Sequence, residues 1–302
     1  MTTTGDREPH LREMGAFLRT RRGELSPGDV GVSRANRRSR VTGLRREEVA
    51  DLARISGDYY ARIEQGRLAP SPAVLAALVS ALKLDGDQAE YLGALADHAA
   101  APSHALGAVS PSQDGQPSDS GTVRPQVMRL LDQLTETPAL VMGPRTDILA
   151  WNPLAARVYV DFGALAPDQR NYVRLIFTDQ RMRWLFDDWE SVARSCVAIL
   201  RREAAANPSD PRLTSLVGEL TVADDDFARW WAAHDVARQD FGTKVLHHPE
   251  VGDLTLDWEI FRYGTAPDQQ LILNSVEPGS ATQQRLATLM RPVNPITQED
   301  FS

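Results

Sequence analysis

Apolar residues in the first hundred positions recur with the spacing of amphipathic helices. Leu11, Met14, Leu18 and Leu25 begin the series, and side chains three to four positions apart lie on one face of a helix. A Ser-Pro-Gly sequence at 26–28 then interrupts the pattern. The same spacing predicts further helices over about 45–53, 58–66, 72–82 and 87–98. We therefore expect an all-α, five-helix domain.

Local signals mark the ends of these helices. Gly66 stands where a helix is commonly followed by a left-handed residue, a conformation that glycine adopts without steric cost. Ser71 and Pro72 form the pattern of an N-cap and a first helical residue.

After residue 122 the pattern changes to short strands and helices. Residues 138–156, PALVMGPRTDILAWNPLAA, predict a strand, a Gly-Pro turn, a second strand and a helix. Asn152 is expected to cap that helix, because Pro153 follows it. Helical segments are expected over about 153–163, 179–205, 209–220 and 223–237.

Strands return near the C-terminal end. Apolar residues occupy every second position at Leu254, Leu256, Trp258 and Ile260. This alternation predicts a half-buried strand, with neighbours at 243–248 and 270–277. Ser280 and Gln283 form a capping-box pattern before a last helix over 281–290. The larger part is thus expected to be α+β, with an antiparallel sheet.

Residues 101–122 separate the two parts. Eleven of these 22 residues are Pro, Gly or Ser, and none is aromatic. Such a segment buries too little apolar surface to offset the entropy of ordering it. We therefore expect a domain at 10–100, a flexible linker at 101–122 and a second domain at 123–302.

Composition excludes several classes of protein. Apolar runs stay far below the ~18 residues that span a bilayer, and the polar start MTTTGDREPH has no signal-peptide core. The single cysteine, Cys196, excludes an internal disulfide and a cysteine-rich metal site. We expect a cytoplasmic protein that uses no metal and has no membrane contact.

Charge is distributed unevenly along the chain. The whole chain carries a net charge of −8, whereas residues 7–67 hold 14 Arg and 9 acidic residues, for a net of +5. Such an asymmetry indicates that the N-terminal part meets a polyanion.

The string GLRREEVADLARISGDYYARIEQGR, residues 43–67, predicts two short helices joined by a tight turn. It resembles the helix-turn-helix of the XRE and lambda-repressor class, whose second helix enters the major groove of DNA. That resemblance implies DNA contacts from the start of the second helix, at Ser56, Gly57, Asp58, Tyr59 and Arg62.

A run of arginines precedes this motif. Residues 34–46 hold six Arg and no acidic residue. Arginine suits bidentate contacts to phosphate and insertion into narrow minor grooves. We expect DNA contacts from five of these residues, Arg37, Arg38, Arg40, Arg45 and Arg46. Arg46 stands where the class often has glutamine, so its contact is either to phosphate or to guanine.

An earlier basic segment lies near the end of the first predicted helix. Its members Arg19, Arg21 and Arg22 are further candidates for contacts to phosphate.

Nearly the whole chain outside the linker and termini resembles the MmyB-like transcriptional regulators of actinobacteria. The resemblance rests on the motif above and on PALVMGPRTDILAWNPLA, RNYVRLIFTDQRMRWLFDDWE, WWAAHDV and HHPEVGDLTLDWE. It implies an XRE-type domain followed by a PAS-like domain that binds a small, fatty-acid-like ligand. The implied protein is a ligand-responsive regulator that binds double-stranded DNA as a homodimer and associates with the nucleoid.

A sensor pocket of this kind is mostly apolar, with a few placed polar groups. Aromatic candidates for its walls are Trp151, Phe177, Trp184, Phe186, Trp189, Trp230 and Trp258. An acidic head group would need a cation, for which Arg174, Arg183 and His234 are candidates. Each of these residues could instead serve core packing or surface pairing.

Enzyme chemistry finds little support. The motifs HExxH, GxGxxG and GxSxG are absent from the sequence. His247 and His248 are adjacent on an expected strand, so they face opposite sides and do not suit one metal ion. Cys196 lies in an apolar helical stretch, where an inert buried thiol is expected.

Two alternatives remain open for the larger domain. It could be an interaction module that binds another protein and no small molecule, which a fully packed core would favour. It could also be an enzyme tethered to DNA, which a convergent polar cluster would favour.

Overall fold

The structure is a computed structural model that describes residues 7–32, 43–100, 121–234, 241–263 and 266–290. The chain folds into two compact units. The first unit comprises residues 1–115 and 194–238, and the second comprises 116–193 and 239–302. The helix α10, Trp189–Ala206, therefore has residues in both units.

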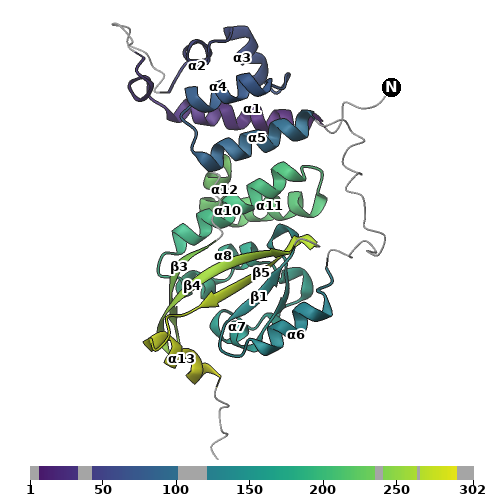
Figure 1. The fold of residues 1–302 in the computed structure, drawn as a ribbon, viewed down its shortest axis with the longest axis vertical. Coiled ribbons are helices and arrows are strands. Elements are labelled where there is room, and N and C mark those ends of the chain that lie inside the picture. Colours follow the sequence, from purple (N-terminus) through teal and green to yellow (C-terminus); the bar gives the residue numbers. More distant parts are fainter. Residues whose placement is uncertain (1–6, 33–42, 101–120, 235–240, 264–265, 291–302) are drawn as a thin grey trace, which may run out of the picture. The chain divides into compact units, whose positions relative to one another are not determined.

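The N-terminal part of the first unit contains five α-helices in its described residues, which confirms the all-α prediction (Figure 1). They are α1 Arg7–Glu24, α2 Arg46–Leu52, α3 Gly57–Glu64, α4 Pro72–Ala81 and α5 Gly86–Ala100. A short 3₁₀ helix, η1, covers Pro27–Val30. The predicted ends also hold, because Ser71 caps α4 and Gly66 has a φ of 68°.

The first unit also contains helices from much later in the chain. They are the greater part of α10, α11 Pro211–Ala223 and α12 Asp225–Ala232. Ala205 of α10 belongs to the same hydrophobic core as Met14, Tyr60 and Leu92. The core around the helix-turn-helix motif thus includes a residue from beyond the predicted linker.

The second unit is built on a five-stranded antiparallel sheet, which confirms the predicted α+β class (Figure 1). Its strands are β1 Ala139–Met142, β2 Ile148–Trp151, β3 Phe241–His248, β4 Gly252–Tyr263 and β5 Ala266–Ser275. They lie in the order β2-β1-β5-β4-β3. Its α-helices are α6 Pro125–Gln133, α7 Pro153–Val158, α8 Tyr172–Thr178, α9 Gln180–Leu185 and α13 Ala281–Leu289. The 3₁₀ helices η3 Pro144–Thr146, η4 Phe162–Ala164 and η5 Pro167–Gln169 complete it.

Asn152 caps α7 as predicted and also connects neighbouring segments. Its side-chain oxygen accepts from the backbone N–H of Ala155 and of Ala139. Its amide nitrogen donates to the carbonyls of Leu134 and Thr137. Because both polar side-chain atoms of the buried Asn152 are hydrogen-bonded, these bonds offset the cost of removing the amide from water. It therefore fixes the end of α6, the start of β1 and the start of α7 together.

The predicted single helix over 179–205 is wrong. The chain is extended at Phe186, which forms a β-bridge with Leu246 of β3, and Asp187 donates its N–H to the carbonyl of Val245. These long-range backbone bonds end α9 and separate it from α10. The predicted helix over 153–163 ends earlier, at Val158, and α8 was not predicted.

Candidate DNA interface and ligand-binding region

The helix-turn-helix motif is formed by α2 and α3. The turn between them is closed by a hydrogen bond from the N–H of Ile55 to the carbonyl of Ala50, 2.9 Å long. Arg54 within the turn has a φ of 56°. Ser56 is the N-cap of α3, because its hydroxyl accepts from the N–H of Tyr59 at 3.2 Å. A hydroxyl in that bond satisfies one of the open donors of the helix end.

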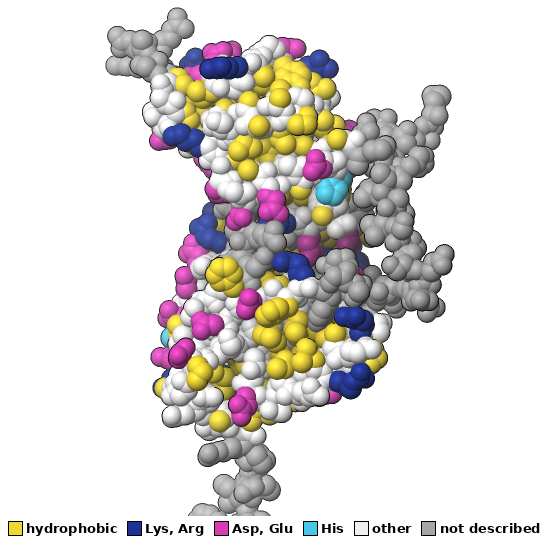
Figure 2. All heavy atoms as spheres, in the orientation of Figure 1, with side chains coloured by type: hydrophobic (Ala, Val, Ile, Leu, Met, Phe, Trp, Pro, Cys, Tyr) yellow, Lys and Arg dark blue, Asp and Glu magenta, His cyan; other side chains and the backbone are white. Residues whose placement is uncertain are grey.

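The exposed face of α3 carries two of the predicted base-contacting residues. Asp58 and Arg62 are both exposed and lie four positions apart, so they share a face. Gly57 and Tyr59 are half-buried. Figure 2 shows basic side chains among acidic ones over the end of the unit where α2 and α3 lie. The arrangement leaves Asp58 and Arg62 accessible to a binding partner.

The far end of α3 is held by a buried ion cluster. The Glu64 carboxylate has no exposed side-chain surface. Arg22 of α1 donates to it from Nε at 2.7 Å, and Arg46 of α2 donates from Nε at 2.9 Å. Burial opposes its charge, but the hydrogen bonds and charges of Arg22 and Arg46 lower the pKa of Glu64 below its ordinary value. This cluster fixes α1, α2 and α3 relative to one another.

Two glycines allow α1 to approach the end of α3 closely. A Cβ on Gly15 would stand 2.9 Å from the carbonyl carbon of Glu64. A Cβ on Gly66 would stand 3.0 Å from the backbone of Arg12. Because these contacts are with backbone atoms, which cannot rotate away, larger residues would push α1 and α3 apart.

The structure places the arginines around this motif in different settings. Arg46 is partly exposed, at 45% of its side-chain surface, while it binds Glu64. Arg45 is exposed, and its backbone N–H donates to Glu48 as the N-cap residue of α2. Three predicted contacts, Arg37, Arg38 and Arg40, lie outside the described residues.

Two exposed arginines near α3 escaped the sequence prediction. Arg54 lies in the turn before α3 and Arg67 follows Gly66. The sequence signal was their position at either end of the second helix.

All three phosphate candidates on α1 are engaged within the first unit. Arg22 binds Glu64, Arg19 forms an ion pair with Glu64 at 3.6 Å, and Arg21 donates to the carbonyls of Ala233 and His234. Their guanidinium groups therefore serve the packing of helices in this structure.

The predicted ligand-contacting residues are divided between the two units. Trp230 and His234 belong to the first unit, whereas the remaining eight belong to the second. Those eight are Trp151, Arg174, Phe177, Arg183, Trp184, Phe186, Trp189 and Trp258. Because the aromatic residues lie far apart in the sequence, the sequence alone did not indicate which of them contact one another.

Within the second unit the aromatic residues make separate local contacts. Phe177 packs edge-on against Trp189, with ring centroids 5.7 Å apart, and the Arg183 guanidinium lies 3.7 Å from the Trp189 ring centroid. Trp151 packs against Phe162, with ring centroids 5.3 Å apart. In contrast, 72% of Trp184 is exposed, so it is not a wall of an enclosed cavity.

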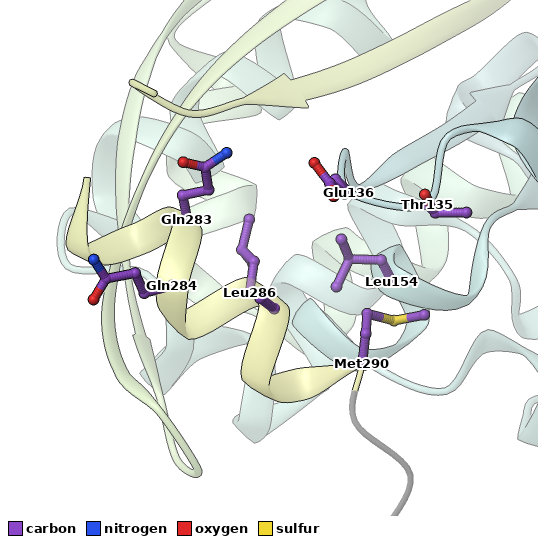
Figure 3. A pocket seen from close by; sticks show the side chains of 8 residues that line it. Thr135, Glu136, Leu154, Gln283, Gln284, Leu286 and Met290 are labelled. Atoms are coloured by element: carbon purple, nitrogen blue, oxygen red, sulfur yellow. The ribbon is translucent and has the colours of Figure 1, made fainter. Parts of the chain in front are cut away.

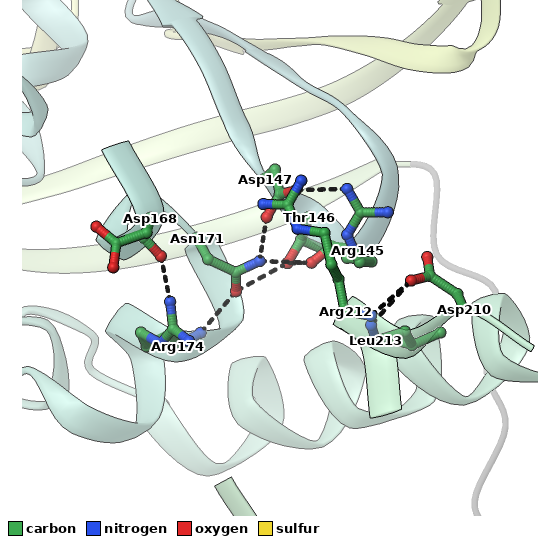
Figure 4. Close-up of polar contacts among 9 residues, drawn as sticks. All are labelled: Arg145, Thr146, Asp147, Asp168, Asn171, Arg174, Asp210, Arg212 and Leu213. Atoms are coloured by element: carbon green, nitrogen blue, oxygen red, sulfur yellow. Dashed lines mark hydrogen bonds and ion pairs between the residues drawn. The ribbon is translucent and has the colours of Figure 1, made fainter. Parts of the chain in front are cut away.

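Trp258 and Arg174 occupy other places. Trp258 is half-buried on β4, and the Lys244 ammonium lies 6.0 Å from its ring centroid. The guanidinium of Arg174 donates to the carbonyl of Asp168, and the backbone N–H of Arg174 donates to the side-chain oxygen of Asn171 (Figure 4). These bonds place the Arg174 guanidinium against η5, so a ligand carboxylate would have to compete for it.

Asn171 supports the turn between β1 and β2. Arg145 and Thr146 both have positive φ values, of 59° and 63°. The Asn171 amide nitrogen donates to the Arg145 carbonyl at 2.7 Å and to the Asp147 carboxylate at 2.9 Å (Figure 4). A left-handed conformation is costly for a β-branched residue such as Thr146. The Asn171 bonds offset that cost, which gives the cluster a structural role.

A surface hollow of about 520 Å³ lies beside α13 in the second unit (Figure 3). Its apolar lining is Leu154 of α7 and Leu286, Ala287 and Met290 at the C-terminal end of the described chain. Its polar lining is Thr135, Glu136, Gln283 and Gln284. The ten candidates for a ligand site named from the sequence do not line this hollow.

Comparison with known families accounts for both parts of the chain. A model described as the MmyB-like transcription regulator ligand binding domain matches residues 123–289. A helix-turn-helix domain model matches residues 13–92. The chain belongs to the MmyB-like transcription regulators. A search of curated proteins gave no match.

Both matched families describe regulators and not enzymes. In this MmyB-like regulator Cys196 is buried, as expected for an inert thiol. His247 is exposed and His248 is buried, so the two imidazoles face opposite sides of β3 as predicted. Within the described residues, no group of three or more His, Cys, Asp or Glu side chains is arranged to hold a metal ion.

Helix length and polarity also bear on membranes. Among the described ranges of this MmyB-like regulator, every helix is too short or too polar to traverse a bilayer.

Proposed function

We propose that this MmyB-like regulator reads a specific DNA sequence with α3. The observation that carries the proposal is the pair Asp58 and Arg62, exposed on a helix that Ser56 caps and Glu64 anchors. A rigid helix with exposed polar residues in its first turns matches the way this motif presents side chains to base edges in the major groove.

Residues around α3 would provide contacts to the phosphate backbone. The proposed set joins Arg45, Arg46 and Ser56 with Arg54 and Arg67, and with Arg37, Arg38 and Arg40 outside the described residues. Gly57 and Tyr59, in the first turn of α3, would instead lie at the base edges with Asp58 and Arg62. Phosphate contacts fix the position of a protein on DNA, whereas base contacts specify the sequence. We propose binding as a homodimer to an inverted repeat, because such motifs use paired half-sites.

The test uses a duplex selected by the full-length wild-type chain from a random-sequence pool. Arg62→Ala should weaken binding to that duplex by about 1–3 kcal/mol, with a much smaller effect on a scrambled duplex. Arg229→Ala removes the same charge from an exposed position on α12 and serves as the control. Equal losses on both duplexes would contradict a base-reading role for Arg62.

We further propose that the second unit binds a small ligand with an apolar body in the hollow beside α13. Leu154 and Leu286 are buried beneath it, so they offer an apolar floor. Its described lining residues include Glu136 and carry no cation. A fatty-acid-like ligand would therefore fit better through its chain than through its carboxylate.

Paired ligands test this proposal on the full chain. Binding of a long-chain fatty acid and of the alcohol of equal chain length is measured by calorimetry, with Leu286→Gln as the variant and Leu273→Gln on β5 as the comparison. The alcohol should bind more tightly than the acid, and Leu286→Gln should weaken both. Binding unchanged by Leu286→Gln would remove the hollow as the ligand site.

A second candidate is that the second unit binds another protein. It is favoured by the exposure of Met290 and Ala287 on the rim of the hollow, since partner-binding surfaces often present apolar side chains. Native mass spectrometry distinguishes the two. A small molecule that leaves on denaturation would support ligand sensing, and a bound protein chain would support the alternative.

A further inference from the structure

Part of the region matched by the ligand-binding family model folds with the DNA-binding helices. The matched region is 123–289, yet residues 194–238 belong to the first compact unit. By sequence, the helices α10, α11 and α12 lie in the region that matches the ligand-binding family. In the fold, α11, α12 and most of α10 belong to the first unit, together with the helix-turn-helix motif. A specific set of polar side chains accompanies this arrangement.

Arg201 of α10 is the centre of that set. Only 2% of its surface is exposed. It donates from one terminal nitrogen to Glu13 of α1 at 2.6 Å, and from the other to the carbonyl of Trp231. Its guanidinium also lies 4.2 Å from the Trp231 ring centroid. Its Nε is buried without a hydrogen-bond partner among the described residues, so the contacts of the two terminal nitrogens carry the compensation that a buried charge requires.

Glu13 gathers further segments around α1. Its carboxylate accepts from the hydroxyl of Tyr91 on α5 at 2.8 Å and lies 3.1 Å from Nδ1 of His234, after α12. Nδ1 of His234 also lies 2.8 Å from Arg201. We call Glu13, Tyr91, Arg201 and His234 the Glu13 cluster.

The charge on Glu13 is strongly favoured. Burial raises its pKa, but the hydrogen-bond contact with His234 and the charge of Arg201 outweigh burial and lower the pKa of Glu13 to about 2. The carboxylate is therefore ionised at neutral pH, and removal of it would leave Arg201 buried without its counter-ion.

A second bond set on α1 reinforces the contact. Arg21 donates to the carbonyls of Ala233 and His234 at 2.9 and 3.1 Å. These carbonyls follow α12, where a helix leaves acceptors without intrahelical partners. A cation at that end also complements the helix dipole. Two turns of α1 are thus bonded to the end of α12.

Helix α1 also contacts the end of α3, the proposed DNA-reading helix. Gly15 lies two residues from Glu13 and contacts the backbone of Glu64, and Arg22 binds the Glu64 carboxylate. Side chains on α1 therefore connect α10 on one side with the end of α3 on the other.

We propose that Arg201 is a positioning residue for DNA recognition, which holds α1, and through it α3, by means of the Glu13 cluster. The helix α10 that carries Arg201 begins at Trp189, within the second unit. The expected effect of Arg201 on DNA affinity rests on the proposed function of α3. The expected effect of Arg201 on the positions of α1 and α3 does not depend on that function.

The first experiment measures amide hydrogen exchange on full-length Arg201→Met. Exchange in α1 and α3 should accelerate about tenfold or more, because removal of one partner from a buried ion pair is strongly destabilising, while exchange in β4 should stay at the wild-type rate. Arg202→Met is the matched control, since Arg202 contacts Glu90 from a more exposed position. Wild-type exchange in α1 and α3 of Arg201→Met would overturn the proposal.

The second experiment measures affinity for the selected duplex. Arg201→Met and Glu13→Gln should each weaken it about tenfold, the double variant should be no weaker than either alone, and Arg201→Lys should recover part of the loss. Additive losses, or no recovery with lysine, would overturn a role through the Glu13 pair. Faster exchange in α3 with unchanged affinity would support positioning and contradict DNA reading by α3. Should Arg201→Met fail to fold, Glu13→Gln and Arg201→Lys carry both measurements.

Discussion

The backbone of Gly15 packs directly against the carbonyl of Glu64, so α1 and α3 meet where neither has room for another atom. Gly15→Ala should therefore destabilise the first unit by about 1–3 kcal/mol, because the inserted methyl group overlaps backbone. Chemical denaturation followed by circular dichroism measures this change.

Gly93 provides the comparison for that substitution. It lies inside α5, and a Cβ added to it would meet no described atom within 4 Å. Gly93→Ala should stabilise the protein by about 0.5–1 kcal/mol, because alanine restricts the unfolded chain more than glycine does. Equal effects at the two glycines would show that the contact between Gly15 and Glu64 does not constrain the helices.

Loss of the Glu64 charge should lower the free energy of unfolding of the first unit. Glu64→Gln leaves Arg22 largely buried without its counter-ion, and we expect a loss of about 3 kcal/mol in the free energy of unfolding. Asp51→Asn on the exposed side of α2 should change stability by less than about 0.5 kcal/mol. A loss for Glu64→Gln no larger than that of the control would contradict the anchoring role of the cluster.

Acid should weaken the first unit through Glu13. The folded pKa of Glu13, about 2, lies below its ordinary value of 4.5, so its ionisation stabilises the folded state above pH 4.5. That contribution is lost as the pH falls from 4.5 toward 2. Unfolding free energies of the wild type and Glu13→Gln, measured across this window, should converge at low pH. A constant difference between the two proteins would exclude Glu13 as the titrating group.

His247 should titrate above its ordinary pKa. Its Nδ1 lies 2.8 Å from the Asp253 carboxylate and its Nε2 lies 2.9 Å from the Asp187 carboxylate. The hydrogen bonds with Asp253 and Asp187 raise the pKa of His247 above 6.5. Because the folded pKa is the higher one, the stabilisation is present below pH 6.5 and is lost as the pH rises through the folded value.

Nuclear magnetic resonance titration of the imidazole tests this directly. Asp187→Asn should lower the pKa of His247, whereas Asp188→Asn should leave it near the wild-type value. Equal pKa values in the wild type and Asp187→Asn would show that the contact between His247 and Asp187 is absent in solution.

Local signals in the sequence were sufficient for the helix-turn-helix motif. The caps at Ser56 and Ser71, the left-handed Gly66 and the apolar spacing act within a few residues, so they can be recognised without the fold. The same holds for Asn152 before Pro153, which marks the start of α7.

Long-range contacts could not be predicted in the same way. The break between α9 and α10 depends on a β-bridge from Phe186 to Leu246, far along the chain. The pair of Glu13 and Arg201 spans 188 positions, and each residue alone resembles an ordinary charged position on a helix. For the same reason, the sequence did not reveal that His234, a candidate for holding a ligand acid, lies beside Glu13.

The shared packing of α1 with α10 and α12 sets a limit on domain exchange by recombination. A chimera that joins residues 1–100 of this chain to the sensing region of a relative would separate Glu13 and Arg21 from the residues that bind them. A functional hybrid would have to carry the segment 194–234 together with the N-terminal helices. The segments that such a hybrid would have to keep together are thus discontinuous in sequence.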